Sequence, residues 1–156
     1  MKKYEILEKE IFSLLTSKQI AEISEAALIK DFEADQIIYE QKEPAKNLFI
    51  LLEGEVSLRV PSRNDTSIES LSLEIENIVQ HGSLFGTNLL FDVKRYVTRA
   101  RAIKPSKVMI LDAEKFLEII KENKSEFIVM SYLAKVYFQR YVNAMKEFEE
   151  CVRQTN

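Results

Sequence analysis

The sequence predicts an α+β domain with an antiparallel β core and helices gathered at its two ends. Apolar residues recur at helical spacing in residues 1–31 and 113–156, whereas residues 32–112 hold short β-branched or alternating runs separated by polar residues, proline and glycine. Parallel βαβ units would interleave helices with strands, so this order favours antiparallel pairing. A chain of 156 residues that is 46% hydrophobic can bury one full core, which predicts a single domain over 1–156.

Two short helices are predicted ahead of the strands. In EILEKEIFSLL (5–15), apolar residues three and four apart share one face. In SKQIAEISEAAL (17–28), Thr16 or Ser17 can cap the first turn. The apolar stripe of this second helix consists of Ile20, Ile23, Ala27 and Leu28. Both helices are expected to pack on the β core, which is expected to begin at Phe32.

Four runs between residues 32 and 112 have strand character, namely QIIYEQ, NLFILLEGEVSLRV, ESLSLEI and RYVTRARAIKPSKVMILD. In the second run, Gly54 permits the positive φ that a tight hairpin can require, so it separates two strands. The polar stretch PSRNDTS is predicted to be a mobile loop. In the last run, the period of two puts Thr98, Ala100 and Ala102 inward and Arg99 and Arg101 outward.

Helical spacing returns at the end of the chain. Asp112 can cap AEKFLEII, and Asn123 and Ser125 separate this helix from a long one that follows Lys124. The long helix has an apolar seam at steps of three and four, formed by Phe127, Met130, Ala134, Tyr137, Tyr141, Ala144, Phe148 and Cys151. We expect this seam to support a homodimer; the alternative is that it packs on the protein's own β core.

Composition excludes several classes of protein. The net charge of −3 argues against a protein that coats nucleic acid. The N-terminus lacks the apolar region of a signal peptide and no run of about 18 apolar residues occurs, so we expect a cytoplasmic protein without a membrane span. The one histidine, His81, is interpreted as a turn residue beside Gly82, far in sequence from the one cysteine, Cys151. Neither a metal site nor a Cys–His nucleophile is therefore expected, and we predict that the chain is not an enzyme.

Residues 94–107 carry six basic side chains and no acidic one, so the local field is expected to be positive. Helix–turn–helix character is missing, and charges along a strand are more typical of a solvated face than of a nucleic-acid site. Arginines on an edge strand also discourage aggregation.

The order of these elements resembles the cyclic-nucleotide-binding domain family from about Ile11 to Phe116. The run IFSLLTSKQIAEISEAALIKDFEADQIIYEQKEPAKNLFILLEGEVSL is similar to the family's opening helices, strand, Gly-Glu-Pro-type turn, aromatic-apolar strand and glycine hairpin. HGSLFGTNLLF resembles its Gly-Asp-x-Phe-Gly-Glu turn and short helix, and VMILDAEKF resembles its closing strand and helix start. All three glycines, Gly54, Gly82 and Gly86, stand where that pattern has glycine.

This resemblance implies an antiparallel β-roll of the double-stranded β-helix or jelly-roll type, with N-terminal helices over 1–31, the roll over 32–112 and C-terminal helices over 113–156. The alternative is another antiparallel β domain with terminal helices. In transcription factors of the family, the long helix leads into a DNA-binding module. This chain ends at Asn156, so no such module is expected.

In this family the ligand lies in a phosphate-binding cassette, where helix amides and an arginine hold the cyclic phosphate and a glutamate accepts a hydrogen bond from the ribose. The resemblance places the cassette over 85–98 and implies cAMP, cGMP or another small anion as ligand. The candidate ligand-binding residues are Phe85, Gly86, Thr87, Asn88, Leu89, Arg95, Tyr96, Val97 and Thr98.

Two anchor positions depart from the family's pattern. Thr87 stands at the glutamate position and lacks a charged acceptor. When the family's pattern is aligned without gaps from Gly86 to Ala102, Tyr96 stands at the arginine position. Arg95 then lies one residue before that position, on the opposite face of a strand. A one-residue deletion instead aligns RYVT with the family's Arg-x-Ala-Thr signature, but it requires an insertion before Ala102. The ungapped alignment is preferred because unneeded bulges are uncommon.

We therefore hypothesise a non-catalytic regulatory or sensor domain in which a small ligand binds near 85–98 and the C-terminal helix moves against the roll. An altered anionic ligand could be reached by Arg95 or Arg99, with Lys94 adding charge. The alternative is a degenerate, ligand-free protein-interaction module that uses the C-terminal helix.

Overall fold

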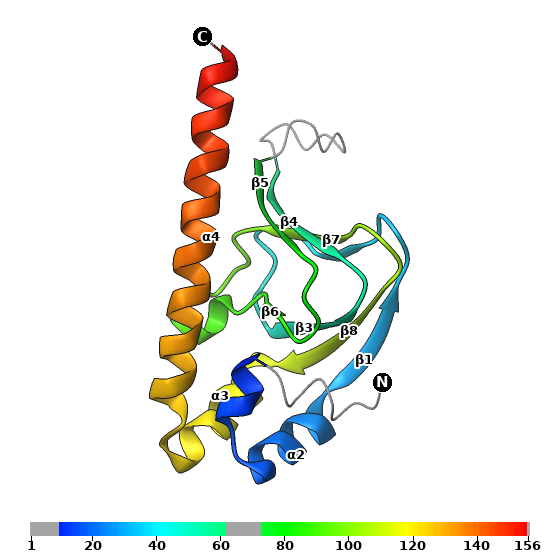
Figure 1. Ribbon diagram of the computed structural model, residues 1–156. Coiled ribbons are helices and arrows are strands. Elements are labelled where there is room, and N and C mark those ends of the chain that lie inside the picture. The colour runs from blue at the N-terminus through cyan, green and yellow to red at the C-terminus, as the bar shows by residue number, and fades with distance from the viewer. Residues whose placement is uncertain (1–9, 62–72, 156) are drawn as a thin grey trace.

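The computed structural model describes residues 10–61 and 73–155, and it has the predicted α+β architecture with an antiparallel β-roll (Figure 1). In chain order the elements are η1 (Glu10–Leu14), α2 (Ser17–Ala26), β1 (Leu28–Phe32), β2 (Ile37–Tyr39), β3 (Asn47–Glu53), β4 (Val56–Val60), β5 (Leu73–Ile78), β6 (Leu84–Phe85), η3 (Asn88–Phe91), β7 (Arg99–Ala102), β8 (Ser106–Asp112), α3 (Ala113–Lys121), η4 (Glu122–Lys124) and α4 (Glu126–Thr155). The strands form two four-stranded antiparallel sheets, ordered β1-β8-β3-β6 and β2-β7-β4-β5.

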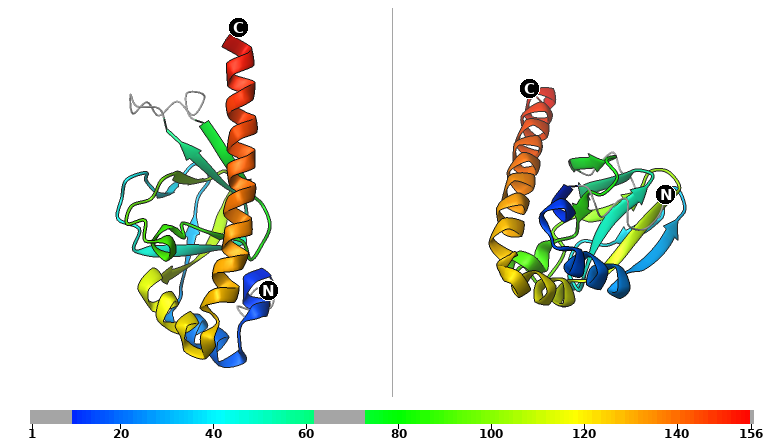
Figure 2. Two further views of the ribbon diagram at one scale, coloured as in Figure 1. Left: turned by 90° about the vertical axis from the view of Figure 1, so that its left-hand side faces the viewer. Right: turned by 60° about the horizontal axis from the view of Figure 1, so that its bottom comes forward.

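Helices cover one end of the roll and one side of it. Figure 1 shows α2 and α3 together below the strands, and Figure 2 shows α4 standing beside the roll with its C-terminal end reaching past the strands. The arrangement leaves α4 with one part of its length against the protein and another part free of the roll. Both termini of the described chain thus lie outside the β core.

The first strand begins earlier than predicted. Leu28 was assigned to the second helix, but the structure ends α2 at Ala26 and pairs Leu28 with Ile110 in β8. Leu28 is 65% exposed, so it does not belong to the buried stripe of that helix. The apolar spacing alone could not show that β8 needs a neighbour on this edge, and pairing along the whole of β1 overrides the helical pattern.

The remaining N-terminal predictions are confirmed in part. Thr16 caps α2 through a capping box, because its hydroxyl accepts from the Gln19 N–H at 3.2 Å while its own N–H donates to Gln19 Oε1 at 3.0 Å. Within the helix predicted over 5–15, the described residues Glu10–Leu14 form the 3₁₀ helix η1, whose Ile11 and Phe12 are fully buried. Residues 1–9 lie outside the described part of the chain.

Strand β3 is buried on both faces. Leu48, Ile50 and Leu52 contribute to a core shared with the helices, whereas Phe49 and Leu51 contribute to a second core inside the roll. This double burial explains why the sequence NLFILL is a continuous apolar run rather than an alternating one. The two cores are therefore separated by little more than this one sheet.

The predicted hairpin and the inward face of the late strand run are confirmed. Gly54 joins β3 to β4 with φ +99°, a value that favours glycine. In β7, Ala100 and Ala102 are buried while Arg99 and Arg101 are only partly buried. Residues 62–72 are outside the described part of the chain, and they include the predicted loop PSRNDTS after Pro61 and the first residues of ESLSLEI. Strand β5 begins at Leu73.

The C-terminal helices begin where predicted, but the apolar residues of α4 do not form one seam. Asp112 caps α3 by accepting from the Lys115 N–H at 2.8 Å. On α4, Val129 and Leu133 are buried against the roll, whereas Phe138 and Phe148 are exposed. A straight helix rotates by about 20° per heptad relative to a 3.5-residue repeat, so a long apolar stripe turns away from a flat partner. The helix also outruns the strands, which leaves its last turns uncovered.

Candidate functional site

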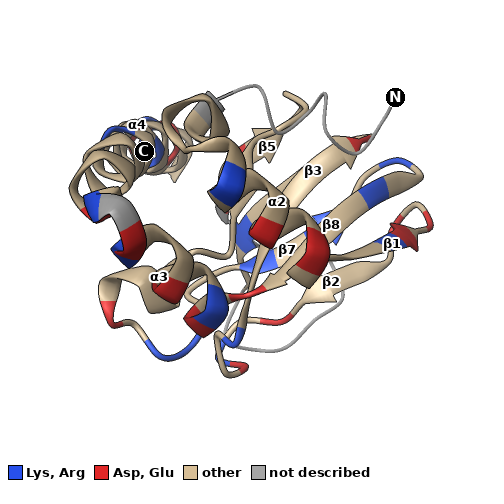
Figure 3. Cartoon of the chain, turned by 90° about the horizontal axis from the view of Figure 1, so that it is seen from below, with Lys and Arg blue, Asp and Glu red and all other residues tan. Residues whose placement is uncertain are grey.

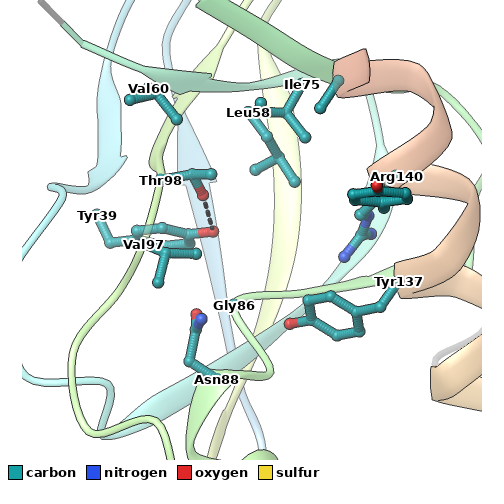
Figure 4. A pocket seen from close by; sticks show the side chains of 12 residues that line it. Tyr39, Leu58, Val60, Ile75, Gly86, Asn88, Val97, Thr98, Tyr137 and Arg140 are labelled. Atoms are coloured by element: carbon teal, nitrogen blue, oxygen red, sulfur yellow. Dashed lines mark hydrogen bonds between the residues drawn. The ribbon is translucent and has the colours of Figure 1, made fainter. Parts of the chain in front are cut away.

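A cavity of about 270 Å³ lies between the β2-β7-β4-β5 sheet and α4 (Figure 4). Its wall combines apolar strand side chains, the segment that follows β6, and one face of α4. The lining residues are Tyr39, Leu58, Val60, Ile75, Gly86, Asn88, Val97, Thr98, Tyr137, Arg140, Tyr141 and Ala144. Four of the predicted cassette residues, Gly86, Asn88, Val97 and Thr98, are among them.

A sharp turn after β6 brings the predicted cassette to the cavity. Phe85 is fully buried and stacks on Phe49, with ring centroids 5.4 Å apart. Gly86 has φ +67°, and a Cβ there would lie 2.7 Å from Cδ2 of Phe49. Only glycine fits where the chain passes this close to an aromatic ring. Leu89, one turn further on, packs against the same roll core from a partly buried position.

The two residues after Gly86 have different partners. Thr87 is buried, and its hydroxyl forms a 2.6 Å hydrogen bond with the phenol of Tyr137 on α4. The residue at the family's glutamate position thus contacts the long helix. Asn88 points into the cavity (Figure 4), and within the described chain its side-chain amide forms no hydrogen bond.

Arg95 and Tyr96 face opposite ways. Tyr96 is 4% exposed, and its hydroxyl donates to the Asn47 carbonyl at 2.6 Å and accepts from the Asn47 N–H at 3.2 Å. Arg95 is exposed and donates from Nη1 to the Lys42 carbonyl at 2.7 Å. The side chains therefore follow the ungapped alignment, with tyrosine inside the roll and arginine outside it.

An aromatic cluster occupies the roll interior behind the cavity. The rings of Tyr39 and Tyr96 are stacked 4.0 Å apart, and Tyr39 also lies 5.2 Å from Phe49. Burial raises the pKa of Tyr96 to about 12 and raises the pKa of Tyr39 further, although the hydrogen bond from Thr98 partly opposes that rise. Both tyrosines are therefore neutral phenols at neutral pH.

Thr98 and Val97 complete the strand side of the site. The Thr98 hydroxyl lies 3.3 Å from the phenol oxygen of Tyr39, and Figure 4 shows this hydrogen bond at the cavity wall. Val97 is 50% exposed and lies at the rim. Neither side chain carries charge into the cavity.

Arg140 fastens α4 to two strands. It is 7% exposed, its Nη2 donates to the Leu84 carbonyl at 2.7 Å, and its Nε bonds to the carboxylate of Glu76 in β5. Its guanidinium also lies over the ring of Tyr137, 5.5 Å from the centroid. The charged helix residue at the cavity is therefore already paired.

Four of the six basic residues over 94–107 are paired with acidic residues from other segments of the chain, so the positive charge predicted there is largely neutralised. The ion pairs are Arg99–Glu40 at 2.7 Å, Arg101–Asp35 at 3.0 Å, Lys104–Glu55 at 3.2 Å and Lys107–Glu53 at 3.9 Å. Figure 3 shows charges of both signs interspersed when the molecule is viewed from the side of α2 and α3. Counting the charged residues of this one segment could not reveal the pairing, because the carboxylates come from parts of the chain that only folding brings close.

Several lining residues were not predicted as site residues. Leu58, Val60 and Ile75 looked like ordinary strand residues, and nothing in the sequence distinguishes them from core positions. The sequence predicts Tyr137 only as part of the helix seam. The position of Arg140 among apolar helix residues could have indicated a buried ion pair, because an arginine on a buried face needs a partner.

Residues 10–61 and 73–155 hold neither a metal-binding cluster nor a membrane-spanning helix. No group of three or more His, Cys, Asp or Glu side chains there is arranged to hold a metal ion. No helix in that part of the chain has both the length and the apolar character needed to cross a bilayer. His81 lies in the turn that precedes β6.

The fold is an antiparallel β-roll with a cavity between one of its sheets and α4. The family model for the cyclic nucleotide-binding domain matches residues 29–123. The chain therefore belongs to the cyclic nucleotide-binding domain family, as its sequence pattern predicted.

The chain is similar to three proteins of different kinds. The chain is 27% identical to a Geobacter metallireducens protein named for cyclic nucleotide binding, with a TM-score of 0.72 and coverage of 90% of this chain and 99% of the other. It has the fold of the sensor domain of the transcriptional regulator DNR from Pseudomonas aeruginosa, with a TM-score of 0.73, 17% identity and coverage of 89% and 90%. It is also 23% identical over 148 residues to the cGMP-dependent protein kinase of Toxoplasma gondii, matching 87% of this chain but only 14% of the kinase.

Proposed function

We propose that this chain is a non-catalytic regulatory domain of the cytoplasm, in which a small molecule bound in the cavity changes how α4 is held against the roll. One observation carries the proposal: Tyr137 and Arg140 line the cavity and also attach α4 to the roll through Thr87, Leu84 and Glu76. A ligand that contacts these side chains acts directly on the attachment of the helix. Such a switch requires only that the ligand contact two helix positions unequally.

Cyclic AMP and cyclic GMP are the first ligands to test. Membership of the family and the similarity to part of a cGMP-dependent kinase support them. The chemistry of the cassette is less favourable, because Tyr96 rather than Arg95 faces the roll interior and Thr87 is bonded to Tyr137. The regulatory proposal does not depend on which ligand binds.

A fluorophore on Cys151 tests the regulatory proposal. Cys151 is the chain's single cysteine and is exposed on α4, so an environment-sensitive maleimide dye can be attached without mutation. We expect a bound ligand to shift the dye's emission, and Tyr137→Phe to reduce that shift while calorimetry still detects binding. The reason is that the mutation removes the hydroxyl contact between cassette and helix.

The matched control carries the same dye elsewhere. Cys151→Ser combined with Glu25→Cys moves it to an exposed position on α2, away from the cavity. The proposal is contradicted if calorimetry detects a ligand bound in the cavity while the Cys151 dye does not respond, or if both dyes respond equally.

The outward face of α4 supports a second function, association with a second copy of this chain. Exposed apolar residues recur there at steps of three and four, the spacing of a self-complementary helix seam. They are Phe138 (67% exposed), Tyr141 (60%), Met145 (42%), Phe148 (56%) and Val152 (43%). Because the pattern continues from the turns beside the roll toward the C-terminal end of α4, which reaches past the strands, a twin helix is the partner that it fits best.

Phe148→Glu is expected to weaken such a dimer by at least about tenfold, because it buries a charge in the apolar seam. Sedimentation equilibrium of both proteins measures the change. Gln154→Glu adds the same charge at an exposed polar position of α4 and is expected to leave association unchanged. A wild-type chain that stays monomeric at high micromolar concentration would rule out this function.

A further inference from the structure

We infer that the cavity takes a neutral, largely apolar molecule of about two fused rings with one hydrogen-bonding group, and not a cyclic nucleotide. This inference deepens the proposed function by naming the ligand class for the same cavity. It rests on three properties of the wall: its size, its charge and the amide of Asn88, which is unpartnered within the described chain.

Size sets the first limit. An apolar cavity of about 150 Å³ holds a benzene molecule, so the cavity of about 270 Å³ has room for a fused two-ring system. Most of its wall is apolar or aromatic, including Leu58, Val60, Ile75 and the ring of Tyr39. Such a wall gains from burying apolar surface and offers a flat ring system good contacts.

Charge excludes an anion. Arg140 is the one charged residue among the described lining residues, and its guanidinium is paired with Glu76 and bonded to the Leu84 carbonyl. Of the two arginines beside Val97 and Thr98 in sequence, Arg95 faces outward and donates to the Lys42 carbonyl, and Arg99 is paired with Glu40. A phosphate or sulfonate would have to leave water without gaining an unpaired cation, which costs binding free energy.

Hydrogen bonding provides the last constraint. Two phenol hydroxyls of the wall already have partners, because Tyr39 is hydrogen-bonded to Thr98 and Tyr137 to Thr87, and the third, on Tyr141, belongs to a side chain that is 60% exposed and open to water. The Asn88 amide points into the cavity and, among the residues that the structure describes, has no partner. A ligand hydroxyl or carbonyl can therefore satisfy Asn88, and one such group is what the wall accommodates.

The test compares two probes with the same ring system, 2-naphthol, which is neutral at pH 7, and naphthalene-2-sulfonate, which is anionic. Isothermal calorimetry should show one 2-naphthol per chain and an affinity at least about tenfold higher than that of the sulfonate. Cyclic AMP and cyclic GMP should produce no heat at millimolar concentration.

Two substitutions locate the site. Ala144→Phe fills the cavity from α4 and should weaken 2-naphthol binding by at least about tenfold. Ala134→Phe, the same change at an exposed position of the same helix, should leave it unchanged. Asn88→Leu keeps the size of the side chain but removes the amide, and should weaken 2-naphthol by about threefold to tenfold. If Ala144→Phe loses its cooperative thermal transition, Val97→Trp at the rim blocks the cavity instead.

The outcomes separate the ligand class from the regulatory proposal. Any of three results would overturn the ligand class: binding of the sulfonate as tightly as 2-naphthol or more tightly, tight binding of a cyclic nucleotide, or an affinity for 2-naphthol that Ala144→Phe leaves unchanged. A cyclic nucleotide that binds and shifts the emission of the Cys151 dye would overturn the ligand class but support the regulatory proposal. Conversely, 2-naphthol that binds in the cavity without shifting the dye would support the ligand class and contradict the regulation.

Discussion

Gly54→Ala is expected to destabilise the protein by about 3–5 kcal/mol, because it combines a strained backbone with an overfilled space. Gly54 has φ +99°, which side chains with a Cβ rarely adopt. The added Cβ would lie 2.7 Å from both the Pro105 carbonyl oxygen and Ser106 Cα, and it would also collide with Ser106 Oγ. That hydroxyl accepts from the Glu55 N–H and donates to the Lys104 carbonyl, so moving it disrupts the join between two hairpins.

Urea unfolding followed by circular dichroism measures this loss. The double variant Gly54→Ala/Ser106→Gly should recover part of the stability, because one of the colliding groups is gone while the backbone strain and the Pro105 contact remain. A stability within about 1 kcal/mol of wild type for the single variant would show that the β3–β4 turn relaxes easily, contrary to this expectation.

Arg140→Met is expected to cost about 2–3 kcal/mol, because it leaves the Leu84 carbonyl and the Glu76 carboxylate without their shared partner. The cost stays below that of a fully buried pair, since the Glu76 side chain is 30% exposed and water can reach it. Methionine keeps most of the packing of the arginine stem, so the loss reports mainly on the polar contacts.

Two controls accompany this variant. Arg153→Met makes the same change at an exposed position of α4 and should alter stability by less than about 0.5 kcal/mol. Adding Glu76→Leu to Arg140→Met should restore part of the stability, because it removes the unpaired charge, whereas the Leu84 carbonyl still lacks its donor. Hydrogen exchange of α4 should become faster in Arg140→Met alone; unchanged protection there would mean that Arg140 does not hold the helix.

The fold was largely predictable because its signals are local or periodic. Gly54 and Gly86 stand at turns with positive φ, Thr16 and Asp112 cap helices as expected, and β7 alternates as its sequence predicts. The start of β1 was missed because its pairing with β8 is a long-range contact that the apolar spacing around Leu28 does not encode.

The candidate site was only partly predictable from sequence. Gly86, Asn88, Val97 and Thr98 were found through the family's motif, and the inward turn of Tyr96 follows from counting residues along the chain. Most of the rest of the wall comes from Tyr39, from β4 and β5, and from α4. The curvature of the sheets and the position of α4 decide which of these residues face the cavity. Local sequence patterns predict neither of them.

The placement of β3 between two cores bears on how this module can be reused. Removing the helices that share the outer core would leave Leu48, Ile50 and Leu52 facing water, and loss of the packing inside the roll would do the same to Phe49 and Leu51. Neither layer can therefore melt alone without exposing the other's scaffold. A gene fusion that borrows the roll has to carry the helical layer with it, so the roll and its helices together are the unit that can be transplanted.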